Sequence, residues 1–150
     1  HLELTNLLIN DYNDSKEDIS QLIDFILEEC PDFVIDAIDD VPAKCALAAF
    51  LTRNNICFVS AMGAALKTRP ELLRAATLDK TEGCALAKKM REMLRREGVD
   101  LRKVRCVYSP EKVAICKDAN GNNVLGSLPM VPAAMGIMLA GEVLSMAREG

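Results

Sequence analysis

A cluster of carboxylates followed by a lysine is the part of the sequence best suited to chemistry. The apolar residues 33–35 are typical of a buried strand, and Asp36, Asp39, Asp40 and then Lys44 follow them. In open α/β sheets, ligands collect at the carboxyl ends of strands. A carboxylate there can hold Mg²⁺ on a phosphate, and a cation one helical turn later can offset developing negative charge. The plainer interpretation is that Asp39 or Asp40 caps a helix and that Lys44 lies on its surface.

A basic segment interrupts an otherwise acidic chain. The 150 residues carry a formal charge of −4, but residues 1–40 carry −11 and residues 88–105 carry +5. A local excess of cations favours an anionic partner such as RNA, whereas the plainer alternative is a solvated helix face. The cations of this segment are Lys88, Lys89, Arg91, Arg95, Arg96, Arg102, Lys103 and Arg105.

The cysteines do not suggest a metal site or a secreted scaffold. There are six, none forms a C-x-x-C pair, and the chain has one histidine, which argues against zinc. A reducing cytoplasm is therefore expected. Cys45 and Cys57 stand in apolar stretches and are predicted to be small buried residues. Cys84 precedes an expected helix, so it is either a candidate nucleophile or, the favoured interpretation, a packing residue.

Alternating strands and helices predict an α/β fold with a Rossmann-like mixed sheet and covering helices. The whole range 1–150 is interpreted as one domain. The expected strands are 2–9, 33–35, 56–60, 104–108 and 113–117, with some strand character at 73–78, and a turn is expected at 118–122. The expected helices begin at Ser15 and at Pro132 and span 44–53 and 85–97.

The last expected helix is apolar nearly all round, from Pro132 to Arg148, which predicts burial in a core or in an interface. The apolar run 128–140 is broken by proline and glycine and is too short to span a bilayer, so no membrane association is expected.

Glycine is missing where a nucleotide-binding α/β domain needs it. There is no glycine before Gly63, although such domains place a Gly-rich loop after the first strand, where backbone N–H groups approach phosphates. Either this chain binds no nucleotide, or it is the C-terminal part of a larger nucleotide-binding domain whose loop lies upstream.

Four runs of residues carry a resemblance to a known family. VIDAIDDVPAK, residues 34–44, resembles the D-x-x-D-x-x-x-x-[RK] segment of the ubiquitin-activating-enzyme-like, or ThiF-type, superfamily. The segment 60–98 begins SAMGA and contains DKTEGCALAK, and it is similar to the central segment of the tRNA threonylcarbamoyladenosine dehydratase branch. VRCVYSPE, residues 104–111, and GSLPMVPAAMGIMLAGEVL, residues 126–144, resemble the Y-S-x-E strand and the closing helix of that branch.

The resemblance implies roles for single residues. Asp39 matches the second Asp of the motif, which helps to hold the Mg²⁺-nucleotide, and Asp36 matches the first, interpreted as structural. Lys44 matches the following basic residue, and Lys80 matches the lysine of a K-T pair near the substrate side; both are taken as catalytic candidates. The chain departs from the pattern at Cys84-Ala85, where relatives often carry a residue followed by proline.

The resemblance also implies an activity. ATP would adenylylate the carboxylate of threonylcarbamoyladenosine in tRNA, and the side chain would then cyclise with net loss of water. ATP and Mg²⁺ are the implied cofactors, tRNA is the implied partner, and a homodimer is expected. One alternative is an adenylyltransferase for a sulfur-carrier protein of the thiamine or molybdopterin pathway, which would add a sulfur-donor or carrier partner. Another is a non-catalytic fragment that binds RNA or dimerises. The missing glycine fingerprint disfavours a third, a nicotinamide dehydrogenase.

Overall fold

The computed structural model describes residues 15–112, 116–117, 123–124, 126 and 128–149. The strand expected at 2–9 and the turn expected at 118–122 lie outside the described residues. Within them a four-stranded sheet has the order β1-β2-β4-β3, and a separate pair joins β5 to β6. The strands are β1 (Phe33–Asp36), β2 (Cys57–Ala61), β3 (Arg74–Thr77), β4 (Arg105–Tyr108), β5 (Cys116–Lys117) and β6 (Asn123–Val124).

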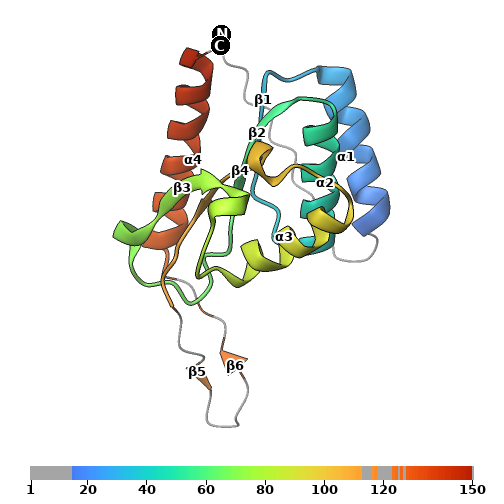
Figure 1. Ribbon diagram of the computed structural model, residues 1–150. Coiled ribbons are helices and arrows are strands. Elements are labelled where there is room, and N and C mark those ends of the chain that lie inside the picture. Colours follow the sequence, from blue (N-terminus) through green and yellow to red (C-terminus); the bar gives the residue numbers. More distant parts are fainter. Residues whose placement is uncertain (1–14, 113–115, 118–122, 125, 127, 150) are drawn as a thin grey trace.

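Helices cover both faces of this sheet (Figure 1). Three of them, α1, α2 and α3, lie on one face, and α4 lies on the other. Their bounds are α1 (Ser15–Glu29), α2 (Val41–Arg53), α3 (Ala85–Arg96) and α4 (Met130–Glu149), with short 3₁₀ turns η1 (Pro70–Leu72), η2 (Leu78–Lys80) and η3 (Leu101–Lys103). The predicted α/β fold with a mixed sheet and covering helices is confirmed.

The sheet is parallel at its centre and antiparallel at one edge. β1 pairs with β2 and β2 with β4 in parallel, whereas β3 runs antiparallel to β4. Successive residues of a strand point to opposite faces. Phe58 therefore belongs to the core under α1, α2 and α3, while Val59 packs under α4. The three parallel strands end at Asp36, Ala61 and Tyr108. Their carboxyl ends lie together on one side of the sheet, which we call the carboxyl edge.

The last helix differs from its prediction. It begins at Met130 rather than Pro132, and only one stripe of it, Val131, Met135 and Leu139, is buried on the sheet. Ile137 remains 75% exposed and Leu144 58% exposed. Burial in a core is therefore wrong for most of this helix, and burial in an interface stays a prediction.

The same helix, Met130–Glu149, is longer than the apolar run 128–140, from which no membrane association was expected. Residues 130–148 are long and apolar enough to cross a bilayer, with a mean hydropathy of 1.6. Length and composition are weak evidence for a span, because a helix that packs on a soluble domain can pass the same test. Here Val131, Met135 and Leu139 pack against the sheet.

Gly83 shows why the segment between β3 and α3 has its local sequence. Its φ is +67°, a conformation that favours glycine. A Cβ at this position would lie 2.4 Å from the backbone oxygen of Pro110. The glycine thus lets the chain leading to α3 pass directly against the segment that follows β4.

Candidate functional site

The candidate site is built on the loop that follows β1. Asp36, the last residue of β1, is 1% exposed, and its carboxylate collects three hydrogen-bond donors. Its Oδ1 accepts from the backbone N–H of Ile38 at 3.0 Å, and its Oδ2 accepts from Ser60 Oγ at 2.6 Å. The third donor is the ammonium of Lys44, 2.9 Å from Oδ2. Asp36 is therefore structural, as the resemblance implied.

Asp40, not Asp39, caps α2. The Oδ1 of Asp40 accepts from the backbone N–H of Ala43 at 2.8 Å, and Pro42 stands in the first turn, where a missing N–H costs nothing. Asp39 is exposed, and its carboxylate has no hydrogen-bond or ion-pair partner within the part of the chain that the structure describes. The cap is thus assigned to Asp40, and the oxygens of Asp39 are left open to a ligand.

Lys44 does not lie where a catalytic cation should. Its side chain is completely buried against Asp36. The ammonium also donates to the backbone oxygen of Ile38 at 2.9 Å and reaches that of Asp36 at 3.5 Å. Its three N–H donors are all directed at these groups, so the ammonium cannot meet a phosphate in this arrangement. Neither the surface position nor the catalytic role predicted for Lys44 fits this geometry.

Lys80 is not brought to the same place. It ends η2, which begins beside the amino end of β4, because Leu78 N donates to Val104 O at 2.8 Å. Asp39 and Lys44 lie beyond the carboxyl end of the parallel strand β1. The neighbouring Thr81 is buried, donates to Leu78 O at 2.8 Å, and receives the guanidinium of Arg91. The two catalytic candidates, Lys44 and Lys80, therefore do not share one site within this chain.

The eight basic candidates divide into two groups. Lys88, Lys89, Arg95 and Arg96 are exposed on one face of α3 and have no ion-pair or hydrogen-bond partner among the described residues. The other four are already engaged with neighbours, namely Arg91 with Thr81, Arg102 with Asp100, Lys103 with Asn55 and Arg105 with Glu142. The four cations without a partner thus lie together on α3, and RNA binding by the eight residues stays a prediction.

One of these pairs also affects a pKa. Arg102 donates from Nε and Nη2 to the two carboxylate oxygens of Asp100, each at 2.9 Å. The hydrogen bond from Arg102 lowers the pKa of Asp100 to about 2. Both side chains are largely exposed, so this pair contributes little stability. A phosphate that bound Arg102 would, however, have to replace its hydrogen bonds to Asp100.

The cysteines are distributed differently from the prediction. Cys45 is buried as expected, but Cys57 is exposed at the start of β2. Cys84 is 6% exposed and is the N-cap of α3, where its Sγ accepts from Ala87 N at 3.5 Å. Burial is the main cause that raises the pKa of Cys45 to about 11 and that of Cys106 to about 12. These positions support a packing role for Cys84.

A second feature of the carboxyl edge was missed by the sequence analysis. Glu111, three residues after β4, binds the loop that follows β2: its carboxylate accepts from Thr68 N at 3.0 Å, Thr68 Oγ1 at 2.7 Å and Arg69 N at 3.2 Å. The hydrogen bond from Thr68 is the largest cause that lowers the pKa of Glu111. The ammonium of Lys67, buried at 3% exposure, donates to the backbone oxygen of Glu111. The Y-S-x-E run was the available signal, but nothing in sequence spacing reveals its partner.

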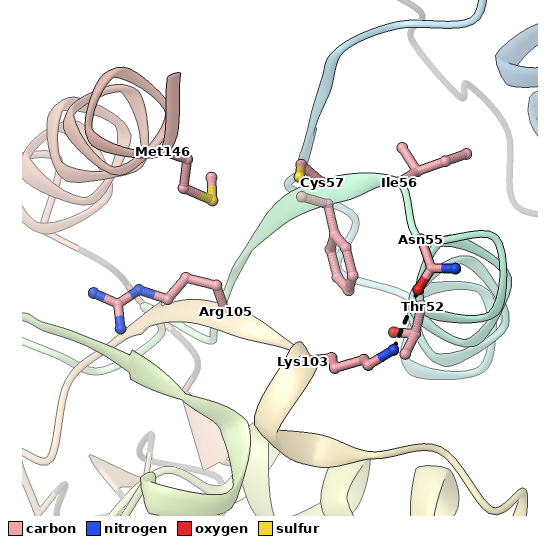
Figure 2. Close-up of a pocket in the computed structure, with 8 residues that line it drawn as sticks. Thr52, Asn55, Ile56, Cys57, Lys103, Arg105 and Met146 are labelled. Carbon is pink, nitrogen blue, oxygen red and sulfur yellow. Dashed lines mark hydrogen bonds between the residues drawn. The ribbon is translucent and has the colours of Figure 1, made fainter. Parts of the chain in front are cut away.

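A shallow hollow lies at the other edge of the sheet. Its volume is about 250 Å³, and it opens beside the amino ends of β2 and β4 (Figure 2). The polar groups in it are already paired: Lys103 donates to Asn55 at 3.2 Å, and Arg105 donates to Glu142 at 2.6 Å. Apart from the free Cys57 thiol, its lining therefore offers no unpaired polar side chain to a ligand. The lining residues are Thr52, Asn55, Ile56, Cys57, Phe58, Lys103, Arg105 and Met146.

Comparison with known proteins gives one consistent result. No protein-family model matches the chain. A tRNA threonylcarbamoyladenosine dehydratase of Bacillus subtilis is 31% identical over 143 residues, which cover 87% of this chain and 54% of that protein. Among solved structures, one named TcdA (CsdL) superposes with a TM-score of 0.75 at 29% identity and covers 94% of this chain and 58% of that one.

Two further structures carry nucleotides. The Escherichia coli tRNA N6-threonylcarbamoyladenosine dehydratase has been solved in complex with AMP (TM-score 0.73, 30% identity) and with ATP (TM-score 0.70, 29% identity). These alignments each cover 89% of this chain and 54% and 55% of the solved chains, respectively. The chain thus spans about half the length of the relatives that it matches across most of its own sequence.

The sequence comparison and the structure comparison identify the same group of proteins. By both criteria the chain is homologous to the C-terminal part of the tRNA threonylcarbamoyladenosine dehydratases and shares their ThiF-type, ubiquitin-activating-enzyme-like fold.

Proposed function

We propose that the protein containing this chain is an ATP-dependent tRNA threonylcarbamoyladenosine dehydratase. The carboxylate of the modified adenosine attacks the α-phosphorus of ATP and displaces pyrophosphate. The resulting acyl-adenylate is closed by an atom of the same side chain, and AMP leaves. The observation that carries this proposal is the match over 87% of the chain to a protein of that name. The competing adenylyltransferase function would instead require a sulfur-carrier partner.

Asp39 is the residue of this chain best suited to the nucleotide site. Its carboxylate is exposed at the carboxyl edge, and the cap that it could have supplied is made by Asp40. Mg²⁺ is commonly held by one or two carboxylates together with substrate phosphates. The described residues contain no group of three metal-ligating side chains, which fits an ion shared with the nucleotide rather than held by the protein alone. When bound, Mg²⁺ would neutralise phosphate charge.

A nucleotide site of this kind also needs a Gly-rich loop that approaches the phosphates, and the sequence has no glycine before Gly63. We assign residues 1–150 to the C-terminal half of an adenylating domain, with the Gly-rich loop in another part of the protein. Two open surfaces support this assignment. β1 is an edge strand of the described sheet and its Ile35 is 47% exposed, while Ile137 and Leu144 project from α4 without cover. An additional strand beside β1 would cover the first surface, and a second copy in a homodimer would cover the second.

The substrate tRNA would lie along the exposed cations of α3. Lys88, Lys89, Arg95 and Arg96 can neutralise phosphates without breaking any contact in the fold. Because the proposed substrate is tRNA, we expect the protein to be located in the cytoplasm.

The test uses the full-length protein and tRNA that carries threonylcarbamoyladenosine. The protein is incubated with ATP and Mg²⁺, the tRNA is digested to nucleosides, and the products are measured by mass spectrometry. We expect the modified nucleoside to lose the mass of one water, with AMP and pyrophosphate formed in equal amounts. Nucleotide turnover that depends on an added sulfur-carrier protein but not on this tRNA would support the competing function instead. RNA binding without any nucleotide turnover would support the non-catalytic alternative.

A further inference from the structure

Both backbone polar groups of Ile38, the residue before Asp39, are held by side chains. The N–H of Ile38 donates to Asp36 Oδ1 at 3.0 Å, and its C=O accepts from Lys44 Nζ at 2.9 Å. Asp36 and Lys44 are in turn joined to each other at 2.9 Å, so strand end, loop and helix form one closed set of contacts. The loop between β1 and α2 is therefore fixed by side chains that come from both flanking elements.

The residue after Asp39 is held as well. Asp40 caps α2 through Ala43, and its own C=O accepts the first helical hydrogen bond, from Lys44 N, at 2.9 Å. Asp39 thus stands between two anchored neighbours, while its own carboxylate is exposed. The backbone on both sides of the carboxylate is fixed, and the carboxylate itself is available.

The network is buried, and each of its buried side-chain nitrogen and oxygen atoms has a hydrogen-bond partner. The side chains of Asp36 and Lys44 are 0% exposed, and Ser60 is buried beside them. Buried ion pairs are costly to assemble, because desolvation offsets much of their attraction. A network of this cost that holds the backbone of a single residue is better explained by the positioning of that residue than by stability alone.

We propose that Asp36, Lys44 and Ser60 are positioning residues that hold the backbone of Ile38 and so direct the Asp39 carboxylate toward a Mg²⁺-bound nucleotide. This inference rests on the proposed function, since it gives Asp39 its ligand. It replaces the catalytic role for Lys44 with an indirect one: Lys44 acts on the nucleotide through Asp39 and never touches it. Preorganised ligands bind more tightly because they do not have to be ordered when the ligand arrives.

The experiment measures equilibrium binding of ATP to the full-length protein by calorimetry, with Mg²⁺ and with EDTA, so that activity is not the readout. Lys44→Met should weaken binding of Mg²⁺-ATP roughly tenfold and Ser60→Ala roughly threefold, the range in which such indirect couplings fall. Binding of ATP in EDTA should change little in both variants. Ser60→Ala keeps the ion pair intact, so it decides the question if Lys44→Met does not fold.

The matched control is Thr52→Val. Thr52 lies on α2, as Lys44 does, and its buried hydroxyl donates to Ala48 O at 2.7 Å, away from the loop. This variant loses a buried hydrogen bond, as Ser60→Ala does, and should leave Mg²⁺-ATP affinity unchanged. Melting temperatures measured without ligand show whether the variants are comparably destabilised.

Combination with Asp39→Asn separates positioning from general damage. If the network acts through Asp39, adding Ser60→Ala to Asp39→Asn should cause no further loss of Mg²⁺-ATP affinity. Independent losses that multiply, or a Ser60→Ala protein with the affinity of the wild type, would overturn the positioning role. If Asp39→Asn alone has no effect while the protein still performs the dehydration, the positioning inference fails and the proposed function stands.

Discussion

A single side chain can have the right chemistry and still be in the wrong place to use it. Lys44 stands one helical turn after the carboxylates, which is where a phosphate-binding cation would be useful, yet its ammonium is buried on Asp36 and the Ile38 carbonyl. The neighbouring Asp39 has the opposite character, because it is exposed and without a partner in the described part of the chain. At the scale of residues, burial thus distinguishes Asp39, the exposed candidate ligand, from Lys44, which is buried and holds the loop beside it.

Asp39→Asn should weaken Mg²⁺-ATP binding by about tenfold or more, equivalent to about 1.4 kcal/mol, because an amide oxygen is a weaker ligand for Mg²⁺ than a carboxylate. The melting temperature should not change, since this side chain is exposed. Calorimetry with Mg²⁺ and thermal unfolding measure the two quantities. Asp32→Asn is the matched control: it also amidates an exposed carboxylate, but before the amino end of β1, and it should leave Mg²⁺-ATP affinity unchanged. Equal affinities of wild type and Asp39→Asn at limiting Mg²⁺ would exclude Asp39 as a ligand.

Cys84→Ala should retain most of the dehydratase activity proposed for the full-length protein. The thiol is buried at the start of α3, and closure of the adenylate by an atom of the substrate needs no thioester. Turnover of modified tRNA is the measurement. A loss of more than about a hundredfold, near 2.7 kcal/mol in barrier, would favour a covalent mechanism.

Stability should fall as pH rises above about 9. Burial holds the pKa of Cys45 near 11 and that of Cys106 near 12 in the folded protein, so both thiols keep their protons where the unfolded chain loses them. The unfolded state then binds fewer protons, and the free energy of unfolding decreases with pH. Urea unfolding between pH 8 and pH 10.5 measures the slope. The Cys45→Ala/Cys106→Ala variant should show a smaller decrease, and an unchanged slope would mean that other groups cause it.

At the scale of elements, α3 is amphipathic: one face packs in the core and the other carries exposed cations. Ala87, Met90 and Leu94 are buried against the rest of the core, and this leaves the cations at 88, 89, 95 and 96 on the opposite face. These four side chains have no hydrogen-bond or ion-pair partner among the described residues, so their removal should change RNA binding more than stability.

Reversal of two charges on α3, Arg95→Glu with Arg96→Glu, should weaken tRNA binding by the full-length protein. Each lost phosphate contact should reduce the salt dependence by a little under one unit of log–log slope. ATP affinity should stay the same, because Asp39 lies on another element. The measurement is tRNA binding at several salt concentrations.

The control for net charge is Arg74→Glu with Arg148→Glu, which changes two exposed charges on other elements. If both double variants weaken tRNA binding equally, the effect is general electrostatics. If neither does, the α3 face is only solvated surface.

The other helix of interest, α4, has too little cover in this chain. One stripe packs on β2 and β4, and the Arg105–Glu142 ion pair at 2.6 Å ties the helix to the sheet. The opposite stripe, with Met130, Ile137 and Leu144 one heptad apart, remains exposed. Exposed apolar stripes of this kind usually mark an interface.

At the scale of the whole molecule, the parts of the proposed site are incomplete within 150 residues. The carboxyl edge contains Asp39 and the contact between Glu111 and Thr68. The sequence has no glycine before Gly63, so it lacks a Gly-rich loop there whose backbone could approach phosphates. We therefore expect the isolated chain to release no pyrophosphate from ATP in the presence of modified tRNA. Release above that of a no-protein blank would contradict the assignment of this chain to one half of the site. The full-length protein, assayed in parallel, shows that the assay can detect turnover.

Much of the architecture could be read from local sequence. The buried strands near residues 34 and 58, the Ala-rich helix between them and the amphipathic helix after Cys84 were all expected within a few residues of their observed bounds. Apolar periodicity determines such elements because each must bury one face, and the neighbouring residues carry that information. The family resemblance likewise rests on runs of adjacent residues.

The assignment of polar side chains was decided only by the tertiary structure. Lys44 and Asp36 are eight positions apart, but Ser60, which donates to Asp36, comes from another strand, and Glu111 accepts from the distant Thr68. Whether a charge is solvated, paired or free depends on which distant groups surround it, and composition and spacing contain no such information. For the same physical reason, eight basic residues looked alike in the sequence, while the fold left only four of them free to meet a phosphate.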